Sequence, residues 1–396
     1  MDNSNLKAKN YLKEIKNAFN KNIKNKKEEI NKFCNNNFNK INKKDLKIKD
    51  LNDKIEYYSN PLEIEYLFDL IKDSKSDSDI YNTFCVFNSI NNKFYLIYIC
   101  ERKSIISYDL INIKKINEIK NAHKKNIREI RHYLDNIKKR NLILSISSDD
   151  NNLKLWNIIN FECLLNIKNV NKKGSLYSAC ILNNNNNYYI ITSNWNKNNS
   201  INNIELIKIF NFKGIKIKEI NDSNNNTYFI SDYYDKKLSK NFIITGNSGF
   251  VKSYDFNDCK IYQTYKNFNN YYSHTCIIIN KKEALTELIE STGDGYIQIW
   301  NFHSAQLLKS IKVSSLGIYN ICFWNNKYLF VGSNNLMLMD LTTYKIIKKY
   351  KEYDINVVNV EKMIHPKYGE SLISLNEYGI IQLWINKNID KIKTYY

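Results

Sequence analysis

The chain has few of the residues that interrupt regular structure, with two Pro and ten Gly among 396 residues. It also lacks any window of about 18 uninterrupted apolar residues, the length that a helix needs to span a membrane. The first ten residues are polar and contain no apolar core of a signal peptide. We therefore expect neither a signal peptide nor a membrane span, and an intracellular protein, cytoplasmic or nuclear, that is not secreted.

Residues suited to catalysis are scarce and scattered. The five His form no H-E-x-x-H or other metal-ligand spacing, and neither a G-x-S-x-G motif nor a glycine-rich phosphate loop occurs. Gly293 and Gly295 flank Asp294 in a pattern typical of a hairpin turn, and the adjacent Asp149 and Asp150 indicate another such turn rather than a catalytic carboxylate pair. The sequence predicts a protein that is not an enzyme and has no cofactor or metal site.

Arginine is rare even though the formal net charge is +19: only four of the 59 basic residues are Arg. Bidentate Arg is the usual group that recognises bases and phosphates, so its scarcity argues against specific nucleic-acid recognition. Residues 1–50 hold 14 Lys against 6 Asp or Glu, which makes this part of the chain a basic extension. Because phosphate contacts need only Lys, a nonspecific RNA contact through residues 1–50 stays open.

The eight cysteines never approach C-x-x-C spacing, and most of them lie in apolar runs that resemble strands. This pattern predicts buried free thiols in a reducing compartment rather than a disulfide framework or a zinc site. The cysteines are Cys34, Cys85, Cys100, Cys163, Cys180, Cys259, Cys276 and Cys322.

A repeat runs through the chain from about residue 80. Short β-rich runs alternate with polar turns, and one strand of each cycle ends in an aromatic residue or Met, followed in six of the seven cycles by Asp or Asn. The first members of these pairs are spaced 39 to 54 residues apart, close to the ~40–45 residues of a four-stranded propeller blade. The markers are Tyr108, Trp156, Phe210, Tyr254, Trp300, Met339 and, less well, Trp384.

The second cycle shows the four expected strands most clearly. They are residues 127–134, 142–148, 153–158 and 162–169, with Asp149 to Asn152 forming the tight turn between the middle pair. At these residues the chain resembles the WD-repeat family. The segments LILSISSDDNNLKLWN, which ends at Asn157, and LIESTGDGYIQIWN, which ends at Asn301, match its strand–turn–strand signature. Residues 242–255 and 371–384 match it more weakly.

The resemblance implies an all-β fold, a seven-bladed WD-repeat-type β-propeller over residues 80–396. It also implies a hydrogen-bonded set of His, Ser or Thr, Asp and Trp within a blade. The second blade would supply His123, Ser148, Asp150 and Trp156, whereas the fifth would supply Thr292, Asp294 and Trp300 without a His. The outer strand of the last blade has two candidates, residues 391–396 and a strand donated from residues 54–58.

Residues 1–79 are predicted to form a short N-terminal α-helical extension and a polar linker. Apolar residues between Leu12 and Phe33 approximate one helical face, although Lys26 interrupts it, so a coiled-coil partner for this helix is one alternative and a solvated tail is the other. Asn60 and Pro61 resemble a helix start that leads into a second helix over residues 62–72. Residues 73–79 form the linker.

Without catalytic motifs, the remaining function class is recognition. The family resemblance implies a rigid scaffold for protein–protein interaction within a multiprotein complex, which binds partners on the face made by the turns between strands two and three and the links between blades. The candidate partner-binding residues on that face are Trp195, Lys124, Lys125, Tyr271 and Tyr272. An alternative is a propeller subunit of an RNA-containing assembly, such as a ribosome-biogenesis particle, which contacts RNA through the basic extension. A phosphoinositide-binding propeller is disfavoured because no two Arg are adjacent.

Overall fold

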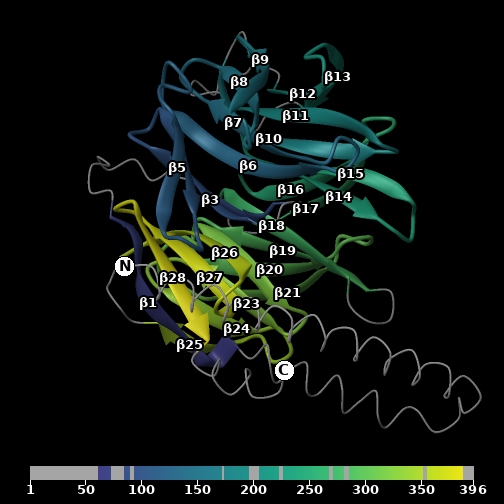
Figure 1. Cartoon of the computed structure of the whole chain (residues 1–396). Helices are drawn as coiled ribbons and strands as arrows, with labels where there is room; N and C mark the ends of the chain where they lie inside the picture. Colours follow the sequence, from purple (N-terminus) through teal and green to yellow (C-terminus); the bar gives the residue numbers. More distant parts are fainter. Residues whose placement is uncertain are drawn as a thin grey trace, which may run out of the picture. The chain divides into compact units, whose positions relative to one another are not determined.

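A computed structural model describes residues 61–72, 84–89, 93–171, 174–195, 205–222, 226–266, 271–280, 285–350 and 355–386. The predicted helix of residues 12–33 and the candidate closing segments 54–58 and 391–396 lie outside these residues. The described part forms seven antiparallel sheets of four strands each (Figure 1). Each sheet is a blade whose innermost strand neighbours the inner strands of the two adjacent blades, and β26 neighbours β2. The ring of blades is therefore closed, as predicted.

The first four blades follow the chain order, with the inner strand first and the outer strand last. Blade 1 consists of β2 (Phe84–Asn88), β3 (Phe94–Cys100), β4 (Ser104–Asp109) and β5 (Lys114–Ile119). Blade 2 consists of β6 (Ile127–Asp135), β7 (Arg140–Ser147), β8 (Asn152–Asn157) and β9 (Glu162–Ile167). Blade 3 consists of β10 (Ser175–Asn184), β11 (Asn187–Trp195), β12 (Glu205–Asn211) and β13 (Lys216–Asp222). Blade 4 consists of β14 (Thr227–Asp235), β15 (Lys240–Asn247), β16 (Phe250–Asp255) and β17 (Ile261–Lys266).

Blades 5 and 6 repeat this order, and blade 7 differs from it. Blade 5 consists of β18 (Ser273–Asn280), β19 (Thr286–Thr292), β20 (Tyr296–Asn301) and β21 (Leu307–Lys312). Blade 6 consists of β22 (Asn320–Asn325), β23 (Tyr328–Gly332), β24 (Leu336–Asp340) and β25 (Lys345–Tyr350). Blade 7 consists of β26 (Val357–His365), β27 (Gly369–Asn376), β28 (Ile380–Asn386) and, as its outer strand, β1 (Ile64–Lys72).

The seven predicted markers all lie near the end of the third strand of a blade, so the blade count is confirmed. The Asp or Asn after the marker explains why this pair repeats. In blade 1, for example, Asp109 Oδ1 accepts hydrogen bonds from the backbone N–H groups of Ile111 and Asn112, which closes the turn into the outer strand. The equivalent side chain makes such a turn in the next five blades, at Asn157, Asn211, Asp255, Asn301 and Asp340.

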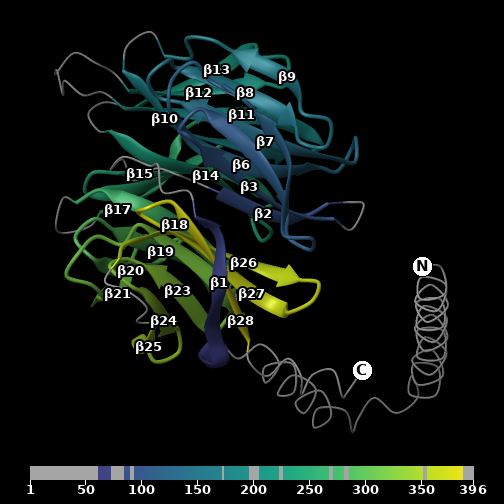
Figure 2. The ribbon, with the colours of Figure 1, turned by 60° about the vertical axis from the view of Figure 1, so that its left-hand side comes forward.

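Strand β1 closes the ring, and this corrects two expectations. Residues 64–72 are a strand rather than a helix, and they occupy the place proposed for residues 391–396 or 54–58. Figure 2 shows this dark strand beside the yellow strands of blade 7. The register of β1 against β28 shifts between Tyr66 and Phe68 and again between Asp69 and Ile71. Because each shift reverses which face the side chains point to, the apolar residues lose the alternation of a strand and imitate helical spacing.

Blade 6 holds the start of this closing strand. Lys348 Nζ donates to the carbonyls of Leu62 at 2.6 Å and Ile64 at 3.1 Å, and the Tyr350 hydroxyl donates to the carbonyl of Pro61 at 2.8 Å. The side chain of Ile64 is fully buried. A short 3-10 helix, Pro61–Glu63, precedes the strand and is the single helical segment among the described residues.

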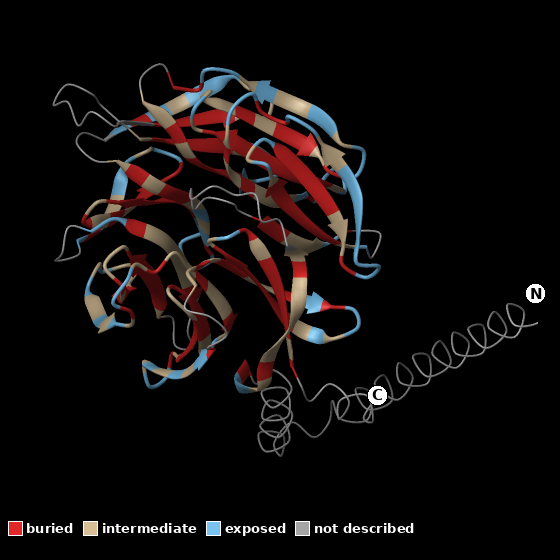
Figure 3. Cartoon of the chain, turned by 90° about the vertical axis from the view of Figure 1, so that its left-hand side faces the viewer, coloured by how far each residue is buried: buried red, intermediate tan, exposed pale blue. Residues whose placement is uncertain are grey.

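The apolar core lies mainly between blades, where the faces of neighbouring sheets meet. One cluster joins Leu96 of blade 1 with Ile373 and Leu383 of blade 7, and another joins Ile297 of blade 5 with Met337 of blade 6. Figure 3 shows that buried residues line the middle strands, whereas the outer strands and turns are exposed. Among the described residues no helix is long and apolar enough to cross a membrane.

Seven of the eight cysteines are described, and none of these seven forms a disulfide. Two of them, Cys85 and Cys180, are buried, and four more are half-buried. Cys163 is exposed because it lies on the outer strand β9, so burial was predicted wrongly there.

Candidate binding site at the mouth of the central channel

The predicted polar network of blade 2 is present with one correction. His123 Nε2 lies 2.8 Å from Ser145 Oγ, and the indole N–H of Trp156 donates to the same oxygen at 2.8 Å. His123 Nδ1 lies 3.9 Å from a carboxylate oxygen of Asp150. Ser145 therefore takes the place predicted for Ser148, which lies half-buried in the turn after β7. The pairing register decides between them, because Ser145 is two residues beyond the partner of Trp156 on β7.

Burial lowers the pKa of His123 to about 4, and nearby Lys154 acts in the same direction against the opposing effect of Asp150. The imidazole is therefore neutral at physiological pH. Its Nε2 can accept a hydrogen bond from the Ser145 hydroxyl, whose oxygen accepts one from the indole N–H of Trp156. The buried bonds among His123, Ser145 and Trp156 tie the link before β6 to the two middle strands of the blade.

In blade 5 the indole N–H of the tryptophan has a different acceptor. Trp300 donates its indole N–H to Glu290 at 3.2 Å, and Ser273 donates to the other carboxylate oxygen of Glu290. The predicted Thr292 and Asp294 instead hydrogen-bond each other in the turn before β20, where Thr292 Oγ1 also accepts from the backbone N–H of Tyr296. They do not contact Trp300 by any of these bonds. In blade 7, Trp384 donates to Ser374 at 2.8 Å in the equivalent arrangement.

The inner strands of all seven blades surround a cavity of about 690 Å³ that forms the central channel. Its lining includes Phe84 of blade 1, Asn320 of blade 6 and Val358 of blade 7. The lining from blades 2 to 5 is richer in aromatic and charged side chains. Because each inner strand begins where the link from the preceding blade ends, we call the entrance at these strand beginnings the link-side mouth.

A bulge near the start of the inner strand aims these side chains into the channel. In blade 2, Ile127 pairs with Ser147 and Glu129 with Ile146, so Arg128 is the extra residue of the bulge. The same shift leaves one residue extra at Tyr228 in blade 4, His274 in blade 5 and Val358 in blade 7, and in blade 3 it falls beside Tyr177. A bulge turns a side chain away from the sheet face, so the repeated bulge converts residues of separate blades into one rim.

Six rings form a continuous arc around this rim. The ring centroids are 5.9 Å apart for Trp195 and Tyr177, 5.7 Å for Tyr177 and Tyr228, and 5.0 Å for Tyr228 and Tyr272. His274 continues the arc at 4.8 Å from Tyr272 and 5.6 Å from Tyr319. All six residues line the cavity. We call this set, Trp195, Tyr177, Tyr228, Tyr272, His274 and Tyr319, the aromatic rim.

Arg128 covers one end of the aromatic rim. Its guanidinium carbon lies 3.2 Å from the centroid of the Tyr177 ring, and its Nε donates to the Tyr177 carbonyl at 3.1 Å. Burial lowers the pKa of His274 to about 4, and the positive charge of Arg128 acts in the same direction. The rim therefore carries a fixed cation at Arg128 and a neutral imidazole at His274.

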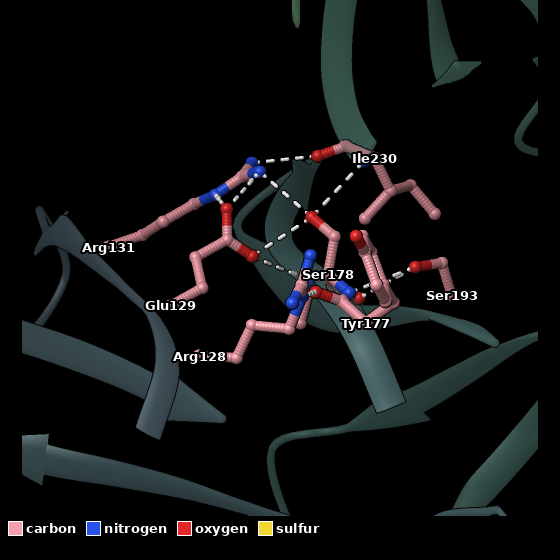
Figure 4. Close-up of polar contacts among 8 residues, drawn as sticks. Arg128, Glu129, Arg131, Tyr177, Ser178, Ser193 and Ile230 are labelled. Atoms are coloured by element: carbon pink, nitrogen blue, oxygen red, sulfur yellow. Dashed lines mark hydrogen bonds and ion pairs between the residues drawn. The ribbon is translucent and has the colours of Figure 1, made fainter. Parts of the chain in front are cut away.

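Beneath Arg128, a polar network connects blades 2, 3 and 4 (Figure 4). Arg131 donates to Glu129 Oε1 at 2.7 Å, to Ser178 Oγ at 3.0 Å and to the carbonyl of Ile230 at 2.7 Å. Ser178 donates in turn to Glu129 Oε2 at 2.9 Å. Burial opposes the charged form of Arg131, but Glu129 outweighs it and raises the pKa of the guanidinium. The network holds Ser178, and with it the adjacent Tyr177, in one position.

The structure places the predicted partner-binding residues unequally around this mouth. Trp195 is the half-buried last residue of β11, paired with Ser175, and therefore belongs to a strand rather than to a polar loop; it faces the channel. Tyr272 is 39% exposed and belongs to the aromatic rim, whereas Tyr271 is 47% exposed and is absent from the residues that line the cavity. Lys124 and Lys125 are exposed in the link that leads into β6.

Gly293 makes the position of Tyr272 possible. A Cβ atom at residue 293 would lie 2.8 Å from the Tyr272 ring, and the backbone N–H of Gly293 donates to the Tyr272 carbonyl at 3.0 Å. The turn identified from the sequence as a hairpin is thus also the wall against which a rim residue packs.

Sequence reasoning missed Tyr177, Tyr228, Tyr319 and Arg128. They come from four different blades or the links before them: bulges bring Arg128, Tyr177 and Tyr228 to the channel, whereas Tyr319 lies just before β22. One signal was present in the sequence: an aromatic residue stands within two residues of the start of the inner strand in blades 3 to 6. Among the described residues no group of three or more His, Cys, Asp or Glu side chains is arranged to hold a metal ion.

The chain matches no protein-family model, and no curated protein is similar enough to it to count as a relative.

Proposed function

We propose that this propeller is a non-catalytic platform for protein–protein interaction of the WD-repeat type, and that the aromatic rim is the surface on which it binds its partner. The observation that carries this proposal is the arc of six rings at one mouth of the channel. Aromatic side chains that are only partly buried dominate the energetics of protein interfaces, because they offer a large, rigid apolar area with a polar tip.

The polar network below the rim supports the same proposal. Burying Glu129 and Arg131 costs desolvation energy, which the hydrogen bonds among blades 2 to 4 offset. This network would fix the positions of the rim residues before a partner binds. A preorganised surface loses less conformational entropy on binding than a flexible one.

The test uses two tyrosines on the same strand. Tyr228 and Tyr234 lie at opposite ends of β14, and only Tyr228 belongs to the rim. Partners are captured on the full chain from the native cell at physiological salt, and the affinity of the purified partner is measured by calorimetry for Y228A and Y234A. We expect Tyr228→Ala to weaken binding by ~2 kcal/mol or more, and Tyr234→Ala, which is 51% exposed, to leave it unchanged. Equal affinities for the two variants would refute the rim as the docking surface.

A second candidate function is that of a propeller subunit in an RNA-containing assembly. The 14 Lys among residues 1–50 favour it, because lysines neutralise phosphates and release counterions. It predicts salt-dependent RNA binding that disappears when residues 1–50 are deleted. RNA binding that persists after this deletion would contradict the role of the extension.

A further inference from the structure

A cluster of basic residues borders the aromatic rim at the junction of blades 1 and 2. Residues 101–103 form the turn between β3 and β4, and the link before β6 packs against this turn. The backbone N–H of His123 donates to the Lys103 carbonyl at 3.3 Å, and that of Ile127 donates to the Arg102 carbonyl at 2.6 Å. The two segments therefore bring together five basic residues, which we call the basic edge: Arg102, Lys103, Lys124, Lys125 and Arg128.

The acidic residues near the basic edge are fewer, and two of them are engaged. Glu101 lies in the same turn as Arg102, and Asp149 lies in the neighbouring turn of blade 2. Asp150 faces His123, and Glu129 pairs with Arg131. Lys103, Lys124 and Lys125 are exposed, whereas Arg102 and Arg128 are half-buried. The edge thus has an excess of positive charge directly beside the rim.

This charge selects against a cationic ligand. An arc of aromatic rings would otherwise suit a Lys or methylated ammonium group, which binds to ring faces. Here Arg128 already occupies the face of Tyr177, and Arg131 lies below it. A second cation would be repelled by the Arg128 guanidinium, whereas Arg131 is paired with Glu129, so the mouth favours an anionic partner.

The ring geometry selects a peptide over a nucleic acid. Stacking of successive bases needs open ring faces. Two of the five ring contacts in the arc are edge-to-face, at interplanar angles of 90° and 83°, and the other three are tilted at 33° to 54°. Neighbouring rings therefore already contact one another and leave no space for a base between them. The cavity is enclosed by seven inner strands, and this shape admits a side chain from above rather than a row of nucleotides.

We propose that the link-side mouth binds an acidic peptide segment: an aromatic or aliphatic side chain of the segment enters the aromatic rim, and carboxylates on either side of it contact the basic edge. This inference rests on the proposed function and adds the chemical class of the partner. Charged groups at the border of an interface chiefly set specificity and association rate, whereas the buried ring contacts supply affinity.

The test selects peptides without assuming their sequence. A phage-displayed library of random peptides about twelve residues long, enough to cross the mouth when extended, is selected on the full chain and on the double variant K124E/K125E. We expect the wild type to enrich Asp and Glu within three positions of an aromatic or aliphatic residue, and the double variant to lose this enrichment. The control is K138E/K139E, which reverses two exposed lysines in the turn between β6 and β7, at the opposite end of β6.

Selected peptides are then measured individually. The affinity for the wild type should fall by roughly tenfold or more in K124E/K125E and in raised salt, and by less than about twofold in K138E/K139E. Enrichment of basic residues, or no charge preference in the selected peptides, would overturn the acidic class. So would a single-stranded uridine oligonucleotide that displaces the selected peptides at equal concentration.

Two further outcomes separate this inference from the proposed function. If the captured partner is lost by Tyr228→Ala but binds K124E/K125E as well as the wild type, the rim is the docking surface and the acidic class is wrong. If Tyr228→Ala leaves partner affinity unchanged, the docking surface itself is wrong and the inference falls with it.

Discussion

The two sides of the propeller share an apolar core between blades and differ in the contacts that are added to it. On one side, Arg131 of blade 2 binds Glu129, Ser178 of blade 3 and the carbonyl of Ile230 in blade 4. Blade 7 is closed by the backbone pairing of β1 with β28 and by apolar packing around Ile64. The closing strand therefore adds stability where the chain completes the ring, whereas the polar network fixes the positions of residues at the channel wall.

The largest effect should come from removing the closing strand β1. Deleting residues 1–72 removes β1, leaves the edge of β28 unpaired and exposes the apolar residues beneath it. We expect this variant to lose its cooperative thermal transition or to aggregate. Deleting residues 1–50 should leave the transition nearly unchanged. Calorimetry of both variants measures their thermal stability. Equal losses of stability would show that the pairing of β1 with β28 is not what stabilises the ring.

The next effect concerns a blade interior. Trp156→Ala removes a large buried ring and takes a donor away from Ser145. The free energy of unfolding in urea should fall by ~3–5 kcal/mol, through the cavity and the lost hydrogen bond to Ser145. Trp156→Phe keeps most of the ring and should cost less. A loss below ~1 kcal/mol for the alanine variant would mean that the network is not part of the core.

In the polar network of blades 2 to 4, Arg131→Met should lower the free energy of unfolding by about 1–3 kcal/mol. The substitution leaves Glu129 with a carboxylate that has lost its cation, and the partial exposure of the pair reduces the penalty from that of a fully buried one. Adding Glu129→Gln should recover most of the loss. A double-mutant cycle in urea measures this, and a double variant no more stable than R131M would contradict the pairing.

A smaller effect follows from Glu361, whose carboxylate accepts the backbone N–H of Val86 at 3.0 Å. Burial raises the pKa of Glu361 to about 8, so the folded protein keeps a proton there that the unfolded chain releases near its ordinary pKa. The free energy of unfolding is therefore highest below the unfolded pKa and falls as the pH rises toward about 8. Glu361→Gln should therefore stabilise the protein more at pH 8 than at pH 5, by on the order of 1 kcal/mol once the ~4 kcal/mol of the full shift is reduced for the partial exposure of the side chain. The same gain at both pH values would argue against titration of this group.

The sequence predicted the features that recur and missed those that depend on register. Seven blades were predictable because each repeats an aromatic marker and a turn-closing Asp or Asn such as Asp109. Ser148 was predicted in place of Ser145 because three serines stand close together, and only the strand pairing selects Ser145. The closing strand was taken for a helix because two bulges disrupt its alternation.

The candidate site was predictable only in part. Trp195 and Tyr272 stood out as aromatic residues in polar surroundings, and both belong to the rim. Arg128 and Tyr177 are 49 residues apart, and only the bulges and the neighbouring inner strands bring them into contact. Such a contact is a property of the ring of blades rather than of any local pattern.

The most direct test of the central claim is the stability and binding of Trp195→Ala. The ring is half-buried, lines the channel and contacts Tyr177 at 5.9 Å. If the rim is a binding surface on an independently stable ring, urea unfolding should show a loss below about 1 kcal/mol while partner binding weakens by ~2 kcal/mol or more. A loss of stability as large as that of Trp156→Ala, or unchanged partner binding, would contradict the claim.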